Sequence, residues 1–195
     1  GGAWLATWAA EVVWQGVFAT APVPASKAGN GRKLATLAPA AALLVSAHAA
    51  MASGGAALWA AGARGAAGPS LLGALLVDLP TGLNAGWLAA ASGIGLTLAA
   101  QHGPGWTRRL ATPEGGAALL TALSAYAAGM LAFLASAPAT AFVGAGYAFA
   151  TAWACRGIQA RPVCAPPVKR AARRGVWAAA AGLAAGLAWG ALKRG

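Results

Sequence analysis

Long apolar segments alternate with short polar and basic segments along the whole chain. Each apolar segment has about the length that a helix needs to cross ~30 Å of hydrocarbon at ~1.5 Å per residue. Apolar runs this long are typical of transmembrane helices. The pattern predicts an all-α integral membrane bundle of about six transmembrane helices in a single domain, with spans at residues 3–20, 34–60, 80–101, 115–137, 140–158 and 175–192.

Residues that weaken helices refine these boundaries. The Ser-Gly-Gly sequence at 53–55 is expected to be the weakest point of the second run, which is long enough to be tilted, kinked or extended beyond the bilayer. Pro80 is expected to end a short lead-in, so that the third span begins near Thr81. The very short connection around Pro138 predicts that the fourth and fifth spans are antiparallel neighbours.

The composition supports a membrane protein and excludes several classes of function. Of the 195 residues, 59% are hydrophobic and 9% are charged, whereas soluble domains carry about 25% charged residues. Three Asp and Glu residues are too few for a carboxylate-rich cation site, a di-iron bundle or a glycosidase. Two Cys and two His form no zinc or iron–sulfur set, and no phosphate-binding loop or nucleophile elbow is present. We therefore expect a non-enzymatic protein with no metal site of its own.

The basic residues are grouped in the connections between the apolar runs. This grouping is typical of charges that orient a membrane protein, and it argues against nucleic acid as a partner despite the net charge of +11. With six spans, the odd-numbered connections hold 11 of the 14 Lys and Arg residues, so they are expected to face the cytoplasm, stroma or matrix. The most basic connection, 156–174, contains three prolines and is expected to be an extended surface loop.

Polar residues at membrane depth supply the first candidate ligand-binding positions. In the first run, Trp8, Glu11 and Gln15 recur at helical spacing and share a face. A carboxylate at that depth is costly unless it is protonated, paired or bound. Glu11 therefore either belongs to a pocket walled by tryptophans or pairs with a neighbouring helix.

His48 lies in the middle of the second run, far from other ionisable groups. A buried neutral imidazole can be the axial ligand of a tetrapyrrole, or it can hydrogen-bond to Ser46 or to a backbone carbonyl. His102, next to Gln101 at the end of the third span, has the same two interpretations. Asp78 lies about one turn from the expected membrane surface and is interpreted as a helix-start or interface residue.

Two further patterns involve glycine and tryptophan. The last run contains Gly182, Gly186 and Gly190 on one stripe, which suits a close neighbouring helix or a flat cofactor, although such spacing also arises by chance in an Ala- and Gly-rich chain. Tryptophans near the span ends are expected to anchor the chain at the membrane interface. Deeper tryptophans suit the wall of a pocket, and these are Trp8, Trp14, Trp87 and Trp153.

Three segments resemble a known family. The sequence LPTGLNAGW at 79–87, continuing to Ser92, is similar to the signature of the longer relatives of the tryptophan-rich sensory protein (TspO/MBR-related) family. Residues 147–158 are similar to that family's late helix, and the Trp-rich first span is similar to its opening helix. The Trp-x-Pro-Pro motif of the shorter members is missing.

The resemblance implies an all-helical membrane protein whose helices enclose a pocket for porphyrin-like or sterol-like molecules. Carried over by position, Trp87 and Trp153 would be its pocket residues. The family is better known for binding and regulation than for turnover.

These observations lead to two hypotheses. The first is a non-catalytic membrane protein that binds a flat hydrophobic ligand, such as chlorophyll, another tetrapyrrole, a carotenoid or a lipid. Its small residues favour contact with membrane lipids and other membrane-protein subunits, as in an accessory subunit of a photosynthetic complex in the chloroplast thylakoid. The mitochondrial or bacterial inner membrane is the alternative location. The second hypothesis is a transporter or channel for a small amphipathic metabolite, although the two halves of the chain do not match as transporter repeats usually do.

Overall fold

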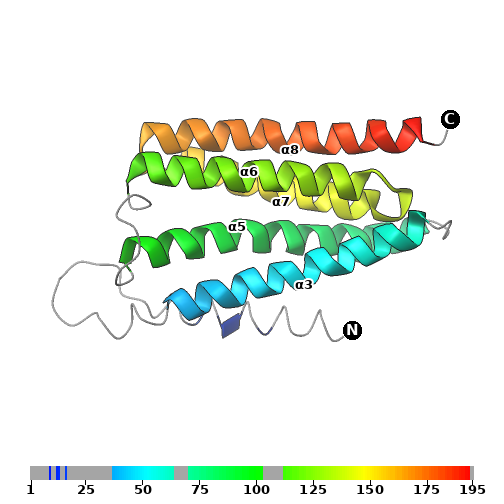
Figure 1. Cartoon of the computed structure of the whole chain (residues 1–195), viewed down its shortest axis with the longest axis horizontal. Coiled ribbons are helices and arrows are strands. Elements are labelled where there is room, and N and C mark those ends of the chain that lie inside the picture. The colour runs from blue at the N-terminus through cyan, green and yellow to red at the C-terminus, as the bar shows by residue number, and fades with distance from the viewer. Residues whose placement is uncertain are drawn as a thin grey trace.

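The computed structural model is a bundle of long helices that lie side by side (Figure 1). The structure describes residues 37–63, 70–102 and 112–193, together with Ala9, Val12, Val13 and Gly16. Within these ranges all regular secondary structure is helical, which confirms the all-α prediction. The long helices are α3 (Leu37–Ala63), α5 (Leu79–His102), α6 (Pro113–Ala135), α7 (Ala141–Ala160) and α8 (Pro166–Leu192).

In the part of the chain that the structure describes, four helical segments are long and apolar enough to cross a membrane. They are Ala41–Ala60, Leu71–Thr97, Pro113–Ala135 and Pro166–Leu192. This supports the prediction of an integral membrane protein, but it does not confirm six spans. The expected fifth span corresponds to α7, which is not one of the four and which carries Arg156 and Gln159 near its end. The expected first span, 3–20, lies outside the described residues except for four positions.

The long helices run alternately in opposite directions (Figure 1). α6 and α7 are joined through a single 3-10 turn, η2 (Pro138–Thr140), and they pack against each other. The prediction that they are antiparallel neighbours is therefore confirmed. α8 then packs extensively against α6, and α5 packs against α7, whereas α3 packs mainly against α5.

The third predicted span differs from the expectation, because its helix does not begin at Pro80. A short helix, α4 (Leu71–Gly73), and a π-helical turn, η1 (Ala74–Asp78), lead without a break into α5. The Leu79 N–H donates to the carbonyl of Ala74, five residues earlier. This wide turn accommodates Pro80, which has no N–H and whose ring would clash with a carbonyl in a regular α-turn. Asp78 thus lies inside a continuous helix and not at a helix start.

α3 is also continuous where a weak point was expected. It runs through the Ser-Gly-Gly sequence at 53–55 without interruption. The hydroxyl of Ser53 donates to the carbonyl of Ala49 on the same helix at 2.9 Å, and Gly55 is buried next to Leu134 of α6. Tertiary packing thus outweighs the low helix propensity of the two glycines.

The basic segment at 156–174 is helical over most of its length, so the prediction of an extended loop is wrong. The connection between α7 and α8 covers only residues 161–165, and α8 begins at Pro166 rather than near residue 175. Pro166 and Pro167 occupy the first turn of α8. Backbone N–H groups in a first turn have no partner within the helix, so the N–H that proline lacks costs no hydrogen bond. The basic residues 169–174 therefore form the first turns of α8.

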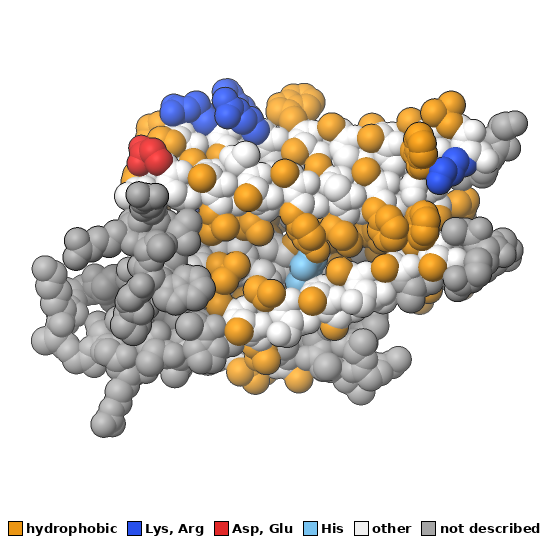
Figure 2. Space-filling view, viewed as in Figure 1, with side chains coloured by type: hydrophobic (Ala, Val, Ile, Leu, Met, Phe, Trp, Pro, Cys, Tyr) orange, Lys and Arg blue, Asp and Glu red, His pale blue; other side chains and the backbone are white. Residues whose placement is uncertain are grey.

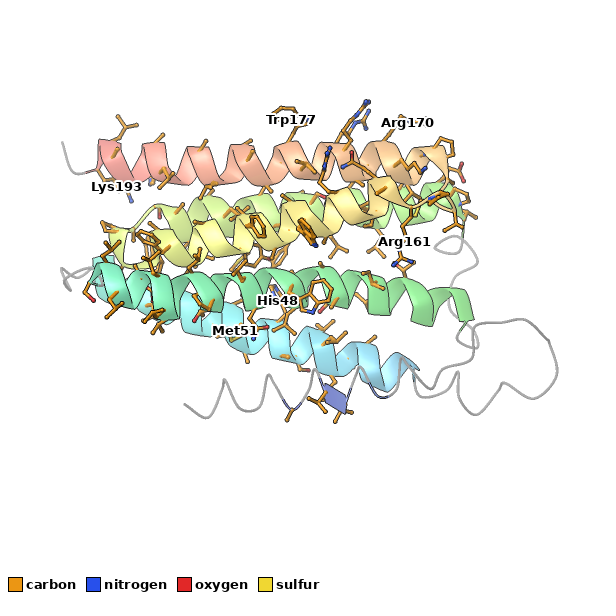
Figure 3. The ribbon with its side chains drawn as sticks, turned by 180° about the vertical axis from the view of Figure 1, so that it is seen from behind. His48, Met51, Arg161, Arg170, Trp177 and Lys193 are labelled. Carbon is orange, nitrogen blue, oxygen red and sulfur yellow. The ribbon has the colours of Figure 1, made fainter. Side chains whose placement is uncertain are left out.

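Charged side chains gather at the ends of the bundle (Figure 2). Arg170 lies near the start of α8 and Lys193 at its opposite end (Figure 3), where the Lys193 Nζ lies 5.1 Å from the ring centre of Trp189. Because the helices alternate in direction, residues of the basic segment 156–174 lie at one end of the bundle. The side of the membrane that this end faces stays a prediction.

Glycines bring two pairs of helices into backbone contact. On α8, a Cβ atom at Gly182, Gly186 or Gly190 would lie 2.5 Å from a carbonyl oxygen of α6 or of its C-cap, Ser136. The predicted glycine stripe therefore serves a close neighbouring helix. Between α5 and α7, a Cβ at Gly86 would lie 2.6 Å from the carbonyl oxygen of Tyr147, and one at Gly146 would overlap the carbonyl of Leu79.

Candidate functional site

A cavity of about 270 Å³ lies between α3, α5, α6 and α7. Figure 3 shows His48 and Met51, two of its lining residues, on the part of α3 that passes α5. Its walls are mainly apolar, and each of the four helices contributes to them. The lining side chains larger than alanine are His48, Met51, Leu58, Val77, Asp78, Thr81, Met130, Leu134, Val143 and Tyr147.

Small residues on α3 leave this space open. Ala50, Ala52, Gly54 and Gly55 line the cavity, and their side chains are too short to fill it. A Cβ atom added to Gly54 would have no other atom within 4 Å. α3 therefore bounds the cavity with a stretch of small side chains.

His48 is held by two hydrogen bonds to other helices. Its Nδ1 lies 3.2 Å from the carbonyl oxygen of Ala85 on α5, and its Nε2 lies 2.9 Å from the hydroxyl of Tyr126 on α6. Because a carbonyl only accepts, Nδ1 carries the hydrogen of the neutral ring and Nε2 accepts from the Tyr126 hydroxyl. Of the predicted partners, the backbone carbonyl is found, whereas Ser46 donates within its own helix to Ala42.

These contacts give His48 a structural role in linking three helices. Axial ligation of a tetrapyrrole would use Nε2, so Tyr126 would first have to release it. The cavity is also slightly smaller than the ~300–1,000 Å³ of pockets that enclose drug-sized ligands. A complete macrocycle beside His48 would therefore require the helices to move apart.

Asp78 is the carboxylate of the cavity. Its Oδ2 atom is buried and has no hydrogen-bond partner. The residue lies seven positions before Ala85, which corresponds to about 10 Å along the helix from the His48 contact. Neighbouring Thr81 is satisfied within the helix, because its hydroxyl donates to the carbonyl of Val77 at 2.6 Å. Asp78 therefore brings an unpaired oxygen to one end of the cavity.

Tyr147 supplies a second unpaired polar group. Its side chain is 1% exposed, and its hydroxyl has no hydrogen-bond partner. Its ring centre lies 6.1 Å from that of His48, with 49° between the ring planes. A buried hydroxyl without a partner loses its hydration and gains nothing in return, at a cost of about 1–3 kcal/mol.

The tryptophans expected to wall the pocket lie elsewhere. Trp87 is 42% exposed and Trp153 is 68% exposed, and neither lines the cavity. Trp153 stacks on Phe149, with 6.2 Å between ring centres. α5 and α7 approach so closely at Gly86 that no indole ring fits between them, so both tryptophans face outward. A ligand bound to them would lie on the outer surface of the bundle.

The remaining predicted site residues cannot be placed against the cavity. Trp8 and Glu11 lie outside the described residues. Gln101 and His102 occupy the last turn of α5, and only their helical backbone is described. Sequence reasoning missed Tyr126 and Tyr147 as partners of His48, although they are the only two tyrosines of the chain.

Comparison of the chain with models of protein families, with curated proteins and with solved structures finds no match. The resemblance to the TspO/MBR-related family thus rests only on residues 79–92, 147–158 and the first span.

Proposed function

We propose that this chain is a non-catalytic membrane protein that binds a small hydrophobic ligand in the cavity between α3, α5, α6 and α7. The observation that carries the proposal is the combination of mainly apolar walls with two unpaired polar groups, Asp78 and Tyr147. Ligand sites typically combine an apolar lining with a few polar groups that fix the orientation of the ligand.

The distances within the cavity favour binding over catalysis. A nucleophile and its base need to lie within about 2.6–3.2 Å of each other. Asp78 lies about 10 Å along α5 from the residue that contacts His48, and both nitrogens of His48 have other partners. The two ionisable groups are thus too far apart to form a catalytic pair.

The cavity volume favours a small molecule or a segment of a larger one. One lipid acyl chain or part of a carotenoid fits this interpretation better than an enclosed tetrapyrrole. A chlorophyll would instead be held on the outer surface, against the stacked rings of Phe149 and Trp153 and between this chain and a partner subunit. This arrangement suits the accessory subunit of a photosynthetic complex in the thylakoid that the sequence predicts, with the basic end toward the stroma.

Binding of 2-phenylethanol, a neutral molecule that combines a flat ring with one hydroxyl, tests the cavity. The protein is purified in non-ionic detergent, and saturable binding is measured by calorimetry against empty micelles. Ala52→Phe places a ring at a lining position and should abolish binding, whereas Ala49→Phe on the exposed side of α3 should not. The proposal fails if the unmodified chain shows no saturable binding, or if both variants bind equally well.

Absorption spectroscopy of the protein purified from its native membrane tests the pigment and partner assignment. We expect a bound pigment, together with co-purifying membrane subunits identified by mass spectrometry. Trp153→Leu should release a pigment held on the outer surface, whereas His48→Leu should release one that is axially ligated. A colourless chain that purifies alone would rule out the accessory-subunit assignment.

The second candidate function is a transporter for a small amphipathic metabolite. It is favoured by Asp78, an unpaired carboxylate inside an apolar helix next to a π-turn. Intramembrane carboxylates commonly mark substrate or ion pathways. Flux into proteoliposomes that disappears in Asp78→Asn would support transport over static binding.

A further inference from the structure

The buried Oδ2 atom of Asp78 has no hydrogen-bond partner among the described residues. The residue lies seven positions inside the apolar segment Leu71–Thr97, and an unpaired carboxylate is costly in such surroundings. The described Lys and Arg residues lie in the segment 156–174 and at Lys193, near the ends of the bundle. Among the described side chains, none of them forms an ion pair with Asp78.

A metal ion does not fit this position. Mg²⁺ and Ca²⁺ take about six or more oxygen ligands. The described residues contain no group of three or more His, Cys, Asp or Glu side chains that could hold a metal. The cavity walls around Asp78 are mainly apolar, so the matching cation needs an apolar body as well as a charge.

An organic ammonium group meets both requirements. It is a compact charge with N–H donors for a carboxylate, and a hydrocarbon or aromatic body can fill the space beside Met51 and Leu134. The cavity continues for about 10 Å along α5, from Asp78 to the position of Ala85, so an ammonium group at one end leaves room for one ring and a short chain. The hydroxyl of Tyr147 is buried and unpaired, and a small shift of the side chains around it would open it to a polar substituent on the ring.

We propose that the cavity binds an amphipathic primary amine, with Asp78 as its counter-ion and Tyr147 as the hydrogen-bonding group for the far end of the ligand. This inference rests on the proposed binding function and names the chemical class of the ligand. The amine lies along α3 in the bound state, and its apolar body replaces the contacts that the small residues of α3 do not make.

Two molecules of the same shape test the role of the charge. 2-Phenylethylamine carries an ammonium group where 2-phenylethanol carries a hydroxyl. We expect the amine to bind the unmodified protein about 10- to 100-fold more tightly, as a hydrogen bond between an ammonium group and a carboxylate would provide. Binding of each is measured by calorimetry in non-ionic detergent, because anionic micelles would concentrate the amine.

Variants test whether the carboxylate of Asp78 causes the preference for the amine over the alcohol. In Asp78→Asn, the amine should bind no more tightly than the alcohol, and the affinity for the alcohol should be unchanged. Asp78→Glu should restore much of the preference for the amine. Glu114→Gln, which removes an exposed carboxylate at the end of the bundle, should leave the preference unaltered.

A hydroxylated ligand tests the far end of the cavity. Tyramine adds a ring hydroxyl to 2-phenylethylamine, and we expect it to bind about 3- to 10-fold more tightly to the unmodified protein. This gain should disappear in Tyr147→Phe. If the gain persists, Tyr147 does not contact the ligand and that part of the inference is wrong.

The outcomes separate the ligand class from the proposed function. If both molecules bind equally to the unmodified protein, or if Asp78→Asn keeps the preference for the amine, the inference is wrong while the binding function stands. If neither molecule binds, both fail. The comparison of the two ligands on the unmodified chain needs no substitution, so it remains decisive even if Asp78→Asn does not fold.

Discussion

The α6–α8 pair and the α3 region are built from the same small residues but pack in different ways. On α8, glycines face the backbone of α6 so closely that a Cβ at Gly186 would lie 2.5 Å from the carbonyl oxygen of Ala132. On α3, a Cβ at Gly54 would have no other atom within 4 Å, and the cavity lies alongside. Glycine therefore produces close packing only where a second backbone fills the space that its missing side chain leaves.

The two regions are also held by different forces. Lipid does not drive apolar helices together, so α6 and α8 depend on van der Waals contact along the glycine stripe. α3 packs against α5 as well, and two side chains link it to other parts of the bundle: His48 is bonded to α5 and α6, and Trp59 is bonded to Ser136. On the side that faces α6 and α7, these side-chain links leave space for a ligand.

The largest effect is expected where two backbones touch. In Gly146→Ala, the new Cβ would overlap the carbonyl of Leu79 and would lie 2.7 Å from the nitrogen of Leu83. We expect a loss of about 2–3 kcal/mol in the free energy of unfolding, because neither backbone can move aside. Unfolding in mixed detergent micelles, followed by circular dichroism, measures this loss.

Gly157→Ala on the same helix is the matched control. Gly157 is exposed, and a Cβ there would meet nothing within 4 Å, so alanine should be neutral or stabilising by up to ~1 kcal/mol. Equal unfolding midpoints for the two variants would contradict the backbone contact between α5 and α7.

The next effect concerns the attachment of α3. His48→Leu removes both hydrogen bonds and should lower the free energy of unfolding by about 1–2 kcal/mol, since interhelical hydrogen bonds in membranes contribute ~0.6 kcal/mol on average and up to ~1.7. Ser46→Ala is the control, because its hydroxyl bonds only within α3. A double-mutant cycle with Tyr126→Phe should show coupling, and strictly additive losses would argue against the bond.

A smaller effect is expected at the second link. The indole N–H of Trp59 donates to the hydroxyl of Ser136 at 2.7 Å, and its ring centre lies 4.7 Å from that of Phe133. Trp59→Phe keeps an aromatic ring but loses the hydrogen bond, so we expect a loss of ~0.6 kcal/mol in the same unfolding assay. Trp153→Phe, at an exposed position, should change the free energy of unfolding less; the reverse order would be evidence against the link.

The smallest effect is expected beside the cavity. In Gly55→Ala, the new Cβ would lie 3.0 Å from Cδ2 of Leu134, a flexible side chain that can turn into the open space. We expect a change close to zero in the free energy of unfolding, because the gain in helix propensity offsets the small rearrangement. A loss as large as that of Gly146→Ala would mean that α3 packs as rigidly as α7, and it would remove the contrast between the two regions.

The sequence alone determined the class of the protein and the approximate position of each described long helix. Long apolar runs and the scarcity of charge are local properties, so membrane helices could be located without knowing their neighbours. The errors at Pro80 and at 156–174 arose where a breaker residue was tolerated: one proline follows a π-turn, and two others begin a helix. In both cases the conformation of the flanking turn decided the outcome, and periodicity does not reveal it.

Only the tertiary structure decided which polar residues meet. His48, Ala85 and Tyr126 are separated by tens of residues, and no spacing rule connects them. Trp87 and Trp153 looked like pocket residues because they are large and lie deep in their runs, yet close contact at Gly86 turns both outward. The composition and periodicity of the sequence thus predict how deep a residue lies in the membrane. Whether its side chain points into or out of the bundle depends on how closely the neighbouring helix approaches.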